Sequence, residues 1–575
     1  MPTKRRSSRA QIARDVAEHL ARVASEALEY FPAAGGVIAI VDRGGTLAQT
    51  TFGVADVERG IAMSTDRLFQ IGSISKLFTA LIVNQLVDEG LFAFDDSIGR
   101  VVEWLPSESG VGQATIEELL THTGGVVTGG DSLPDDAAEI WNSRNLVTTS
   151  RGDRFHYSNL GYLLLGEAVR ARSGQLLGDL VRTRWLEPLA MRDALARAGY
   201  AQRQDFAPGY WPRRPDRPWV PGDELDRASW FEVDSASGNV SASSADMARL
   251  VMALLGAANN DPLLDDGGEP VLTPAMFERM TSTLAPQGEP VYVPDGVEPV
   301  SESRYGMGIN VERIGGRQLV SHGGGMVGYS TFMLVDCTSE VGLVVLTNAN
   351  GNVVLSHLLS RVGLADFVQR ENGGGSLAPI SLATTVREHG ALPAEGSGTF
   401  YARSDETAIE FVVDASTGLV EVLRGGESGR LYRQPNGRFV SDHPQLRTFC
   451  LDLRGDDREP CWLYGAETFG ARVSPDEVVR SERPLPHPLV GHYRSYTPWY
   501  PEFRIFEREN ELWLAAPGGV EAPDNDVCLV QVGVDLYRVG SDPWLPERLI
   551  VSAARGDEVV ALERDGCLYS RVFST

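Results

Sequence analysis

One apolar run constrains the fold of this chain more than any other feature. Residues 77–87, LFTALIVNQLV, place apolar side chains on every side of a helix. Such a helix is expected at the centre of a domain, because it has no face suited to water. Gly90 is placed to end the helix. The residues directly before it, QIGSISK (70–76), therefore stand at the start of a buried helix.

Lys76 is unusual in this chain. Only two of its 52 lysine and arginine residues are lysines, and the other is Lys4 in a polar terminus. Arginine keeps its proton, whereas a buried lysine can give its proton up. Ser73 lies three residues before Lys76 and shares a helix face with it, while Ser75 points elsewhere. This spacing predicts a serine nucleophile activated by an amine; the alternative is a chance pattern at the start of a helix.

Further polar residues typical of catalysis follow in order along the chain. RFHYSNLGYLLLGE carries Tyr157 and Asn159, and LVSHGGGMVGYS carries His322 and Gly324. This order of serine, lysine, tyrosine, asparagine and a histidine–glycine strand resembles the serine β-lactamase and penicillin-binding-protein superfamily. The flanks LFQIGSISKLFTALIVNQLVDEGLFAFDD, TIEELLTHTGGV and YGMGI are similar to its class C-like hydrolases and peptidases, so the resemblance spans about residues 25–365.

The resemblance implies a role for each matching residue. Ser73 corresponds to the nucleophile that becomes acylated, and Lys76 to the base that activates it. Tyr157 corresponds to the tyrosine that passes a proton to the leaving group. Asn159 corresponds to the residue that holds the lysine and the amide carbonyl of the substrate. These roles describe an enzyme that works through an acyl-enzyme intermediate.

His322 departs from a pattern that many relatives share. The triplet His322-Gly323-Gly324 stands where they carry Lys-Thr-Gly, whose lysine attracts a substrate carboxylate. A histidine is a weaker anchor for an anion and is common in relatives that act on amides, esters and peptides with a free N-terminus. We therefore do not expect true β-lactamase activity. The resemblance also places the oxyanion hole at the backbone N–H groups of Ser73 and Gly325.

The favoured function is a serine hydrolase that cleaves amide or ester bonds, of the D-aminopeptidase or D-stereospecific peptidase type. An acyltransferase, a penicillin-binding-protein-type thioesterase or cyclase, and a carboxylesterase would use the same residues and stay open. A silent binding or sensor protein is the least favoured alternative, because the catalytic set is complete. The expected partner is a small molecule or short peptide, no cofactor or metal ion is expected, and a homodimer is possible.

The domain organisation follows from strand patterns and one linker. Paired strands at 36–56 and 330–351 enclose helical segments, which predicts an α/β (α+β) β-lactamase/transpeptidase-like domain with an antiparallel sheet flanked by helices. RENGGGSLAP (370–379) reads as a linker. Beyond it, GTFYARS is echoed by GHYRSYT and LRGDD by ARGDE, which predicts two antiparallel, lipocalin-like β-barrel modules. The predicted bounds are an extension over 1–24, the hydrolase domain over 25–369, a linker over 370–385, and modules over 386–480 and 485–575.

The net charge excludes some classes of binding partner, and the N-terminal stretch indicates the cellular compartment. The formal net charge of −26 argues against nucleic acid or an anionic membrane as partner. The N-terminal stretch has helical spacing at Ile12, Val16 and Leu20 rather than a secretory core, so we expect a cytoplasmic protein. In that compartment the five cysteines are expected as free thiols, although Cys450 and Cys461 could face each other across a hairpin.

Three remaining features keep two interpretations each. His122 in LLTHTGG and His156 beside Tyr157 are interpreted as structural residues rather than catalytic ones. The segment over 210–230, YWPRRPDRPWVPGDELDRASW, is rich in tryptophan, arginine and proline. It forms either a lip of the substrate cleft or a solvated surface loop.

Overall fold

The computed structural model divides the chain into two compact units. The first comprises Met1–Leu28, Pro32–Trp211 and Leu225–Ile380, and the second comprises Glu29–Phe31, Pro212–Glu224 and Ser381–Thr575. The structure describes residues 2–129, 151–232, 234–294, 296–349, 354–376, 392, 396–402, 407–414, 419–455, 459–470, 486–497, 499–520, 522–523 and 525–572. Most of the linker predicted over 370–385, and residues 481–484 between the two predicted modules, lie outside these ranges.

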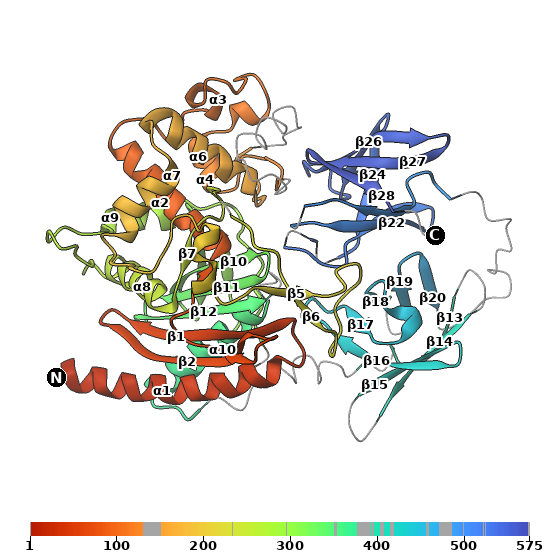
Figure 1. Cartoon of the computed structure of the whole chain (residues 1–575), viewed down its shortest axis with the longest axis horizontal. Coiled ribbons are helices and arrows are strands. Elements are labelled where there is room, and N and C mark those ends of the chain that lie inside the picture. Colours follow the sequence, from red (N-terminus) through yellow and green to blue (C-terminus); the bar gives the residue numbers. More distant parts are fainter. Residues whose placement is uncertain are drawn as a thin grey trace. The chain divides into compact units, whose positions relative to one another are not determined.

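An eight-stranded antiparallel sheet forms the middle layer of the first unit (Figure 1). Its strand order is β3-β2-β1-β12-β11-β10-β9-β8, so segments from both ends of the unit meet at the β1–β12 pair. The predicted paired strands are confirmed as β1–β2 and β11–β12. The strand bounds are β1 Ala33–Asp42, β2 Gly45–Asp56, β3 Ile61–Ala62, β8 Glu302–Tyr305, β9 Asn310–Ile314, β10 Arg317–Met326, β11 Tyr329–Asp336 and β12 Val341–Ala349.

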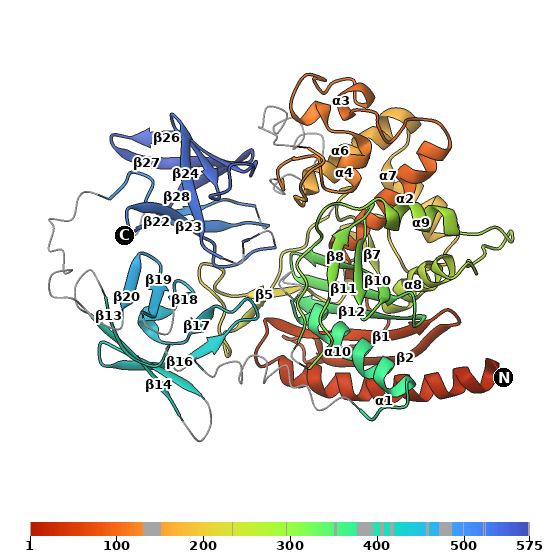
Figure 2. The same ribbon diagram turned by 180° about the vertical axis from the view of Figure 1, so that it is seen from behind.

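Helices cover the sheet on both faces, which is why every residue of β1, β11 and β12 is buried. The helices α1 and α10 pack together against one face, and α8 packs against β1 and β12 from the other (Figures 1 and 2). The predicted central helix is confirmed as α2, whose side chains are buried from Ser75 to Asn84. The helix bounds are α1 Pro2–Ala27, α2 Ser75–Asp88, α3 Ile98–Val101, α4 Ile116–Leu120, α6 Asn159–Ser173, α7 Leu177–Val181, α8 Ser244–Ala258, α9 Pro274–Ser282 and α10 Val354–Glu371.

A 3-10 turn and two small two-stranded sheets complete this unit. The 3-10 turn η1 (Gly72–Ile74) leads directly into α2. Just before it, β4 (Phe69–Gln70) pairs with β7 (Ser241–Ala242), and β5 (Tyr210–Pro212) pairs with β6 (Leu225–Arg227). The residues between β5 and β6 belong to the second unit, where Asp223 forms an ion pair with Arg447 at 2.5 Å. The segment left open as lip or loop is therefore partly an element of the C-terminal unit.

Two closed eight-stranded antiparallel barrels make up the C-terminal region, as predicted. Each is a meander in which every strand pairs with the next, and the first strand pairs with the last. Both interiors are filled by apolar side chains, including Phe411 and Trp462 in the first barrel and Phe503 and Tyr569 in the second. The first barrel has strands β13 Gly398–Ala402, β14 Ala408–Val413, β15 Val420–Arg424, β16 Glu427–Arg433, β17 Phe439–Ser441, β18 Leu451–Arg454, β19 Cys461–Tyr464 and β20 Glu467–Gly470. The second has β21 Gly491–Arg494, β22 Glu502–Arg508, β23 Glu511–Ala515, β24 Val527–Gly533, β25 Leu536–Val539, β26 Arg548–Arg555, β27 Glu558–Arg564 and β28 Cys567–Arg571.

The cysteine pair proposed across a hairpin does not form. The β18–β19 register places Cys461 opposite Arg454, whereas Leu451, directly after Cys450, lies opposite Tyr464. Cys450 and Cys461 therefore lie at opposite ends of the hairpin, and all five cysteines are free thiols. Within the described part of the chain, no helix combines the length and the apolar character that crossing a membrane requires.

Candidate active site

Ser73 lies in the η1 turn, directly ahead of the buried helix α2. The turn is pressed against β10, because a Cβ at Gly72 would lie 2.8 Å from the carbonyl oxygen of Gly325. Gly72 also has φ +53°, a left-handed conformation that favours glycine. The serine is thus held where the first turn of a central helix meets the edge of a β-strand.

Lys76 is fully buried, and its amine connects the elements of the site. Its Nζ donates to Ser73 Oγ at 3.0 Å, to Asn159 Oδ1 at 2.6 Å and to the carbonyl oxygen of Ser237 at 3.0 Å. An amine on a serine hydroxyl is the geometry that proton transfer from that hydroxyl requires. To take the serine proton, the amine must first be in its neutral form.

The two serines of the motif have different surroundings. Ser75 is buried, and its Oγ accepts the backbone N–H of Val240 at 3.0 Å. Ser75 therefore ties α2 to the segment before β7, while Ser73 is the serine that contacts the lysine amine. This is the arrangement expected when residues three apart share a helix face and adjacent ones do not.

Aromatic rings surround the lysine amine. The Nζ of Lys76 lies 4.9 Å from the ring centre of Tyr157 and 5.5 Å from that of Tyr162. Rings attract a cation through their negative faces, so they partly replace the water that Lys76 has lost. Tyr157 is half-buried, which leaves part of its side chain accessible from solvent.

His122 packs beneath Tyr157, with ring centres 4.3 Å apart. Its Nδ1 accepts the backbone N–H of Ser158 at 3.0 Å, which fixes the chain between Tyr157 and Asn159. Burial, with the nearby charge of Lys76, lowers the pKa of His122 well below its ordinary value. His122 is thus a neutral packing residue that supports the Tyr157 segment, and its φ of +57° shows how closely the backbone turns there.

Asn159 opens the helix α6, and its amide oxygen accepts from the amine of Lys76. The preceding residue, Ser158, caps this helix by accepting the N–H of Gly161 at 2.9 Å. Asn159 is 4% exposed, so its contact with the lysine is shielded from water. The cap and the burial fix the position of the amide oxygen that receives the amine proton.

His322 is buried on β10 with both ring nitrogens engaged. Its Nδ1 lies 2.6 Å from the carbonyl oxygen of Gly323, and its Nε2 lies 2.7 Å from the hydroxyl of Tyr305. A carbonyl only accepts, so Nδ1 carries the hydrogen and Nε2 accepts from the tyrosine. Burial lowers the pKa of His322 to about 3. The residue at the Lys-Thr-Gly position therefore presents no positive charge.

A buried ion pair supports β10, the strand of His322, on the face that points away from the catalytic site. Arg361 on α10 donates to both carboxylate oxygens of Glu312 at 2.5 and 2.7 Å, and both side chains are 1% exposed. The hydroxyl of Ser321, adjacent to His322, also donates to Glu312. Because neighbouring residues of a strand face opposite sides, this network lies behind the strand and leaves the site face free.

The glycines after His322 allow two backbones to approach each other. A Cβ at Gly324 would lie 1.9 Å from the carbonyl oxygen of Ile71, which is closer than any real contact. The hydroxyl of Thr331 on β11 donates to that same oxygen at 3.0 Å. Since Gly72 lies against Gly325, the chain around Ser73 and the chain around Gly325 form adjoining walls of one site.

All seven predicted site residues are described, and together they outline one region. Two contributors were not predicted from the sequence. Ser237 acts through its carbonyl oxygen, which has no sequence signature. Tyr305, in the quoted motif YGMGI, donates its hydroxyl to Nε2 of His322, and the motif itself is the signal that could have identified it. Among the described residues, no group of histidine, cysteine, aspartate and glutamate side chains is arranged to hold a metal ion.

Comparison with known proteins adds independent findings. The sequence profile of the beta-lactamase family matches residues 22–364. Penicillin-binding protein 4* of Bacillus subtilis is 25% identical over 339 residues, 54% of this chain and 68% of that protein. A D-aminopeptidase of Brucella anthropi is 24% identical over 550 residues, which span 92% of this chain and 91% of that protein. The octameric penicillin-binding protein homologue from Pyrococcus abyssi superposes with a TM-score of 0.52 at 20% identity, covering 80% of this chain and 99% of that one.

Proposed function

Because this chain belongs to the beta-lactamase family of serine hydrolases, we propose that it hydrolyses amide bonds through an acyl-enzyme on Ser73. The substrate class is short peptides or amides with a free N-terminus and a D-configured first residue. The observation that carries this proposal is the contact of the Lys76 amine with both Ser73 Oγ and Asn159 Oδ1.

The reaction begins with the lysine amine in its neutral form. Lys76 Nζ takes the proton of Ser73, and Ser73 Oγ forms a bond to the substrate carbonyl carbon. The resulting oxyanion accepts hydrogen bonds from the backbone N–H groups of Ser73 and Gly325. Tyr157 gives a proton to the leaving amine as the C–N bond breaks, and it regains one through Lys76. Water then attacks the ester on Ser73 by the reverse proton path.

The neutral form of His322 favours amide substrates over substrates whose own carboxylate must be bound by a cation of the site. A neutral, buried imidazole with both nitrogens engaged adds no attraction for an anion at this point of the site. The preference for a D-configured residue rests on the D-aminopeptidase relative, whose alignment spans 92% of this chain. The apolar side chains that fill both barrels argue against a role in carrying a ligand inside them.

A small substrate panel tests the proposal. The panel holds the p-nitroanilides of D-alanine and L-alanine, a p-nitrophenyl ester and a chromogenic cephalosporin, each assayed with and without added hydroxylamine. We expect the D-anilide to be cleaved at least about 100-fold faster than its enantiomer, a difference of about 2.7 kcal/mol. Fastest turnover of the cephalosporin, or equal rates for the enantiomers, would contradict the proposed substrate class. Hydroxamate as the main product in hydroxylamine would identify an acyltransferase instead.

A cytoplasmic location and a homodimer also stay predictions from the sequence. Cell fractionation tests the first, and light scattering on the purified protein tests the second.

A further inference from the structure

The hydrolase unit contains a second polar cavity of about 530 Å³. Its lining comes from the end of β2, the segments around Arg67 and Arg203, the strand β6 with the residues after it, and the turn between β10 and β11. The volume lies within the range of small-molecule sites, which is about 300–1,000 Å³. None of the residues assigned above to the catalytic reaction lines it.

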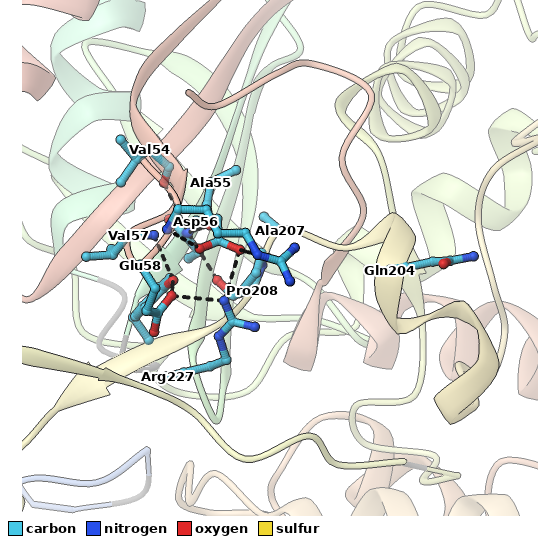
Figure 3. A network of polar contacts seen from close by, with 12 residues as sticks. Val54, Ala55, Asp56, Val57, Glu58, Gln204, Ala207, Pro208 and Arg227 are labelled. Atoms are coloured by element: carbon cyan, nitrogen blue, oxygen red, sulfur yellow. Dashed lines mark hydrogen bonds and ion pairs between the residues drawn. The ribbon is translucent and has the colours of Figure 1, made fainter. Parts of the chain in front are cut away.

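The lining is basic in a chain that is strongly acidic. Four arginines line the cavity against one carboxylate, Asp56, whereas the whole chain has a formal net charge of −26. Arg227 is committed to that carboxylate and to Glu58, each at 2.9 Å, as Figure 3 shows. Arg59 lies 3.9 Å from Asp56. The carboxylates of Asp56 and Glu58 are thus already paired with Arg227, and Asp56 also with Arg59.

The other two arginines are not neutralised in this way. Arg67 donates to the backbone carbonyl of Gln204 at 3.1 Å, and Arg203 stacks on the ring of Tyr200 at 4.1 Å. Neither forms an ion pair with a carboxylate in the described part of the chain. The charge of Arg67 is partly offset by the neighbouring Asp66, whose pKa is lowered by the bond from the Ser64 hydroxyl and by the charge of Arg67. The charge of Arg203 stays available to an anion in the cavity, and salt weakens this attraction because Arg203 is exposed.

The rest of the wall combines aromatic rings with hydrogen-bond donors. Trp230 packs edge-on against Phe206, with ring centres 5.0 Å apart. The Nε1–H of Trp230 and the Nε–H of Arg67 are buried without a hydrogen-bond acceptor among the described residues. The wall therefore combines aromatic rings with two N–H donors that lack a partner in the described part of the chain, which suits a ligand with an apolar body and a carboxylate.

The cavity adjoins the catalytic centre along two segments of the chain. Gln70 lines the cavity three residues before Ser73, and Val327 lines it two residues after Gly325. A chain spans at most about 3.6 Å per residue, so Gln70 lies within about 11 Å of Ser73. A peptide acylating Ser73 covers this distance with two further residues and an acidic side chain.

We propose that this cavity binds the side-chain carboxylate of a peptide substrate, two residues from the bond that is cleaved. The inference rests on the proposed function, and it adds that acidic peptides are preferred among the substrates of the same active site. Lys76 is engaged by Ser73 and Asn159, and His322 offers no charge. The cavity supplies the cation that these two residues do not offer to an acidic substrate.

The test compares the C-terminally amidated tripeptides D-Ala-Gly-Glu and D-Ala-Gly-Gln, which differ only in the side-chain charge. Wild type is expected to cleave the Glu peptide with a kcat/KM at least about tenfold higher, as a hydrogen bond to a charged group provides. Arg203→Glu should bring the ratio of kcat/KM for the Glu peptide to that for the Gln peptide below one. Arg67→Met should bring this ratio toward one. The matched control Arg22→Met removes an exposed arginine of α1 and should leave the wild-type ratio. Thermal melting confirms that each variant is folded.

A ratio near one in wild type, or an unchanged ratio in Arg203→Glu, overturns the cavity assignment. Calorimetric binding of both peptides to Ser73→Ala separates this failure from a failure of the proposed function. Tighter binding of the Glu peptide that Arg203→Glu abolishes supports the cavity even if neither peptide is cleaved. Equal binding of the two peptides contradicts it even if both are cleaved.

Discussion

Lys76 Nζ lies 3.0 Å from Ser73 Oγ, on a side chain with no exposed surface. This contact joins the buried Lys76 to one of two neighbouring serines, whereas the other, Ser75, accepts the backbone N–H of Val240. The contact places the base and the nucleophile of the proposed reaction within hydrogen-bond reach.

Replacing Lys76 by arginine keeps the charge and removes the ability to accept a proton. We expect Lys76→Arg to lower kcat on the best substrate by about 10²–10⁴-fold, the usual cost of losing a general base, or about 3–5 kcal/mol. The measurement is kcat together with a thermal melt, and Lys4→Arg at the chain's other lysine is the control. A folded Lys76→Arg enzyme within about tenfold of wild type would remove the lysine from the proton path and leave Tyr157 as the base.

A methyl group at Gly324 cannot fit beside the chain that leads to Ser73. In Gly324→Ala the new Cβ would meet Ile71 O at 1.9 Å, so β10 and the η1 turn must move apart. A displacement of about 1 Å at a catalytic centre costs about 100-fold in rate. We expect that loss in kcat/KM, while Gly375→Ala, where no heavy atom lies within 4 Å, changes nothing. Equal activity of the two variants would show that this close approach is not needed.

The Glu312–Arg361 pair should be far more important for stability than surface pairs. Arg361→Met leaves Glu312 charged and buried, which is expected to cost about 3–5 kcal/mol in the free energy of unfolding of the hydrolase unit. The double variant Arg361→Met with Glu312→Leu should recover most of this loss, because no charge is left unpaired. The exposed pair Arg182–Glu187 is the control, and Arg182→Met should cost about 0–1 kcal/mol. Urea unfolding followed by tryptophan fluorescence gives the comparison, and equal losses would contradict the role of burial.

His322 should stay neutral across the ordinary pH range. Burial lowers its pKa from the ordinary 6.5 to about 3, so the unfolded chain binds a proton that the folded chain does not. The contribution of His322 to stability is therefore complete above about pH 6.5 and is lost as the pH falls toward about 3. In ¹³C-histidine NMR the His322 resonance, assigned by its loss in His322→Gln, should not shift between about pH 8 and 5. A titration midpoint near 6.5 would contradict the buried, neutral ring.

Local patterns made much of the fold predictable. The apolar run over 77–87 predicted α2, because a helix without a polar face must be buried. The repeated pair GTFYARS and GHYRSYT predicted two barrels, and the two segments form their first strands, β13 and β21. The described residues of LRGDD, 453–455, end the sixth strand of the first barrel, and ARGDE lies where the sixth strand of the second barrel turns into the seventh. These signals are local in sequence, since each depends on a few neighbouring residues.

Contacts between distant segments were not predictable in the same way. Tyr305 and His322 lie on different strands, and nothing in either sequence segment predicts that the hydroxyl occupies Nε2. The arginines of the cavity come from four separate segments and share no spacing. The alternative that Cys450 and Cys461 face each other across a hairpin is wrong because the sequence indicates a hairpin but not its register.

Covalent labelling of Ser73 tests the proposed chemistry most directly. A fluorophosphonate probe should add once to the intact protein, and peptide mass spectrometry should place the adduct on Ser73. Ser73→Ala should not be labelled, whereas Ser75→Ala should be labelled, although it loses the acceptor for the Val240 N–H and about 1–3 kcal/mol of stability. An adduct on any other serine, or labelling of a folded Ser73→Ala protein, would contradict the assignment of Ser73 as the nucleophile.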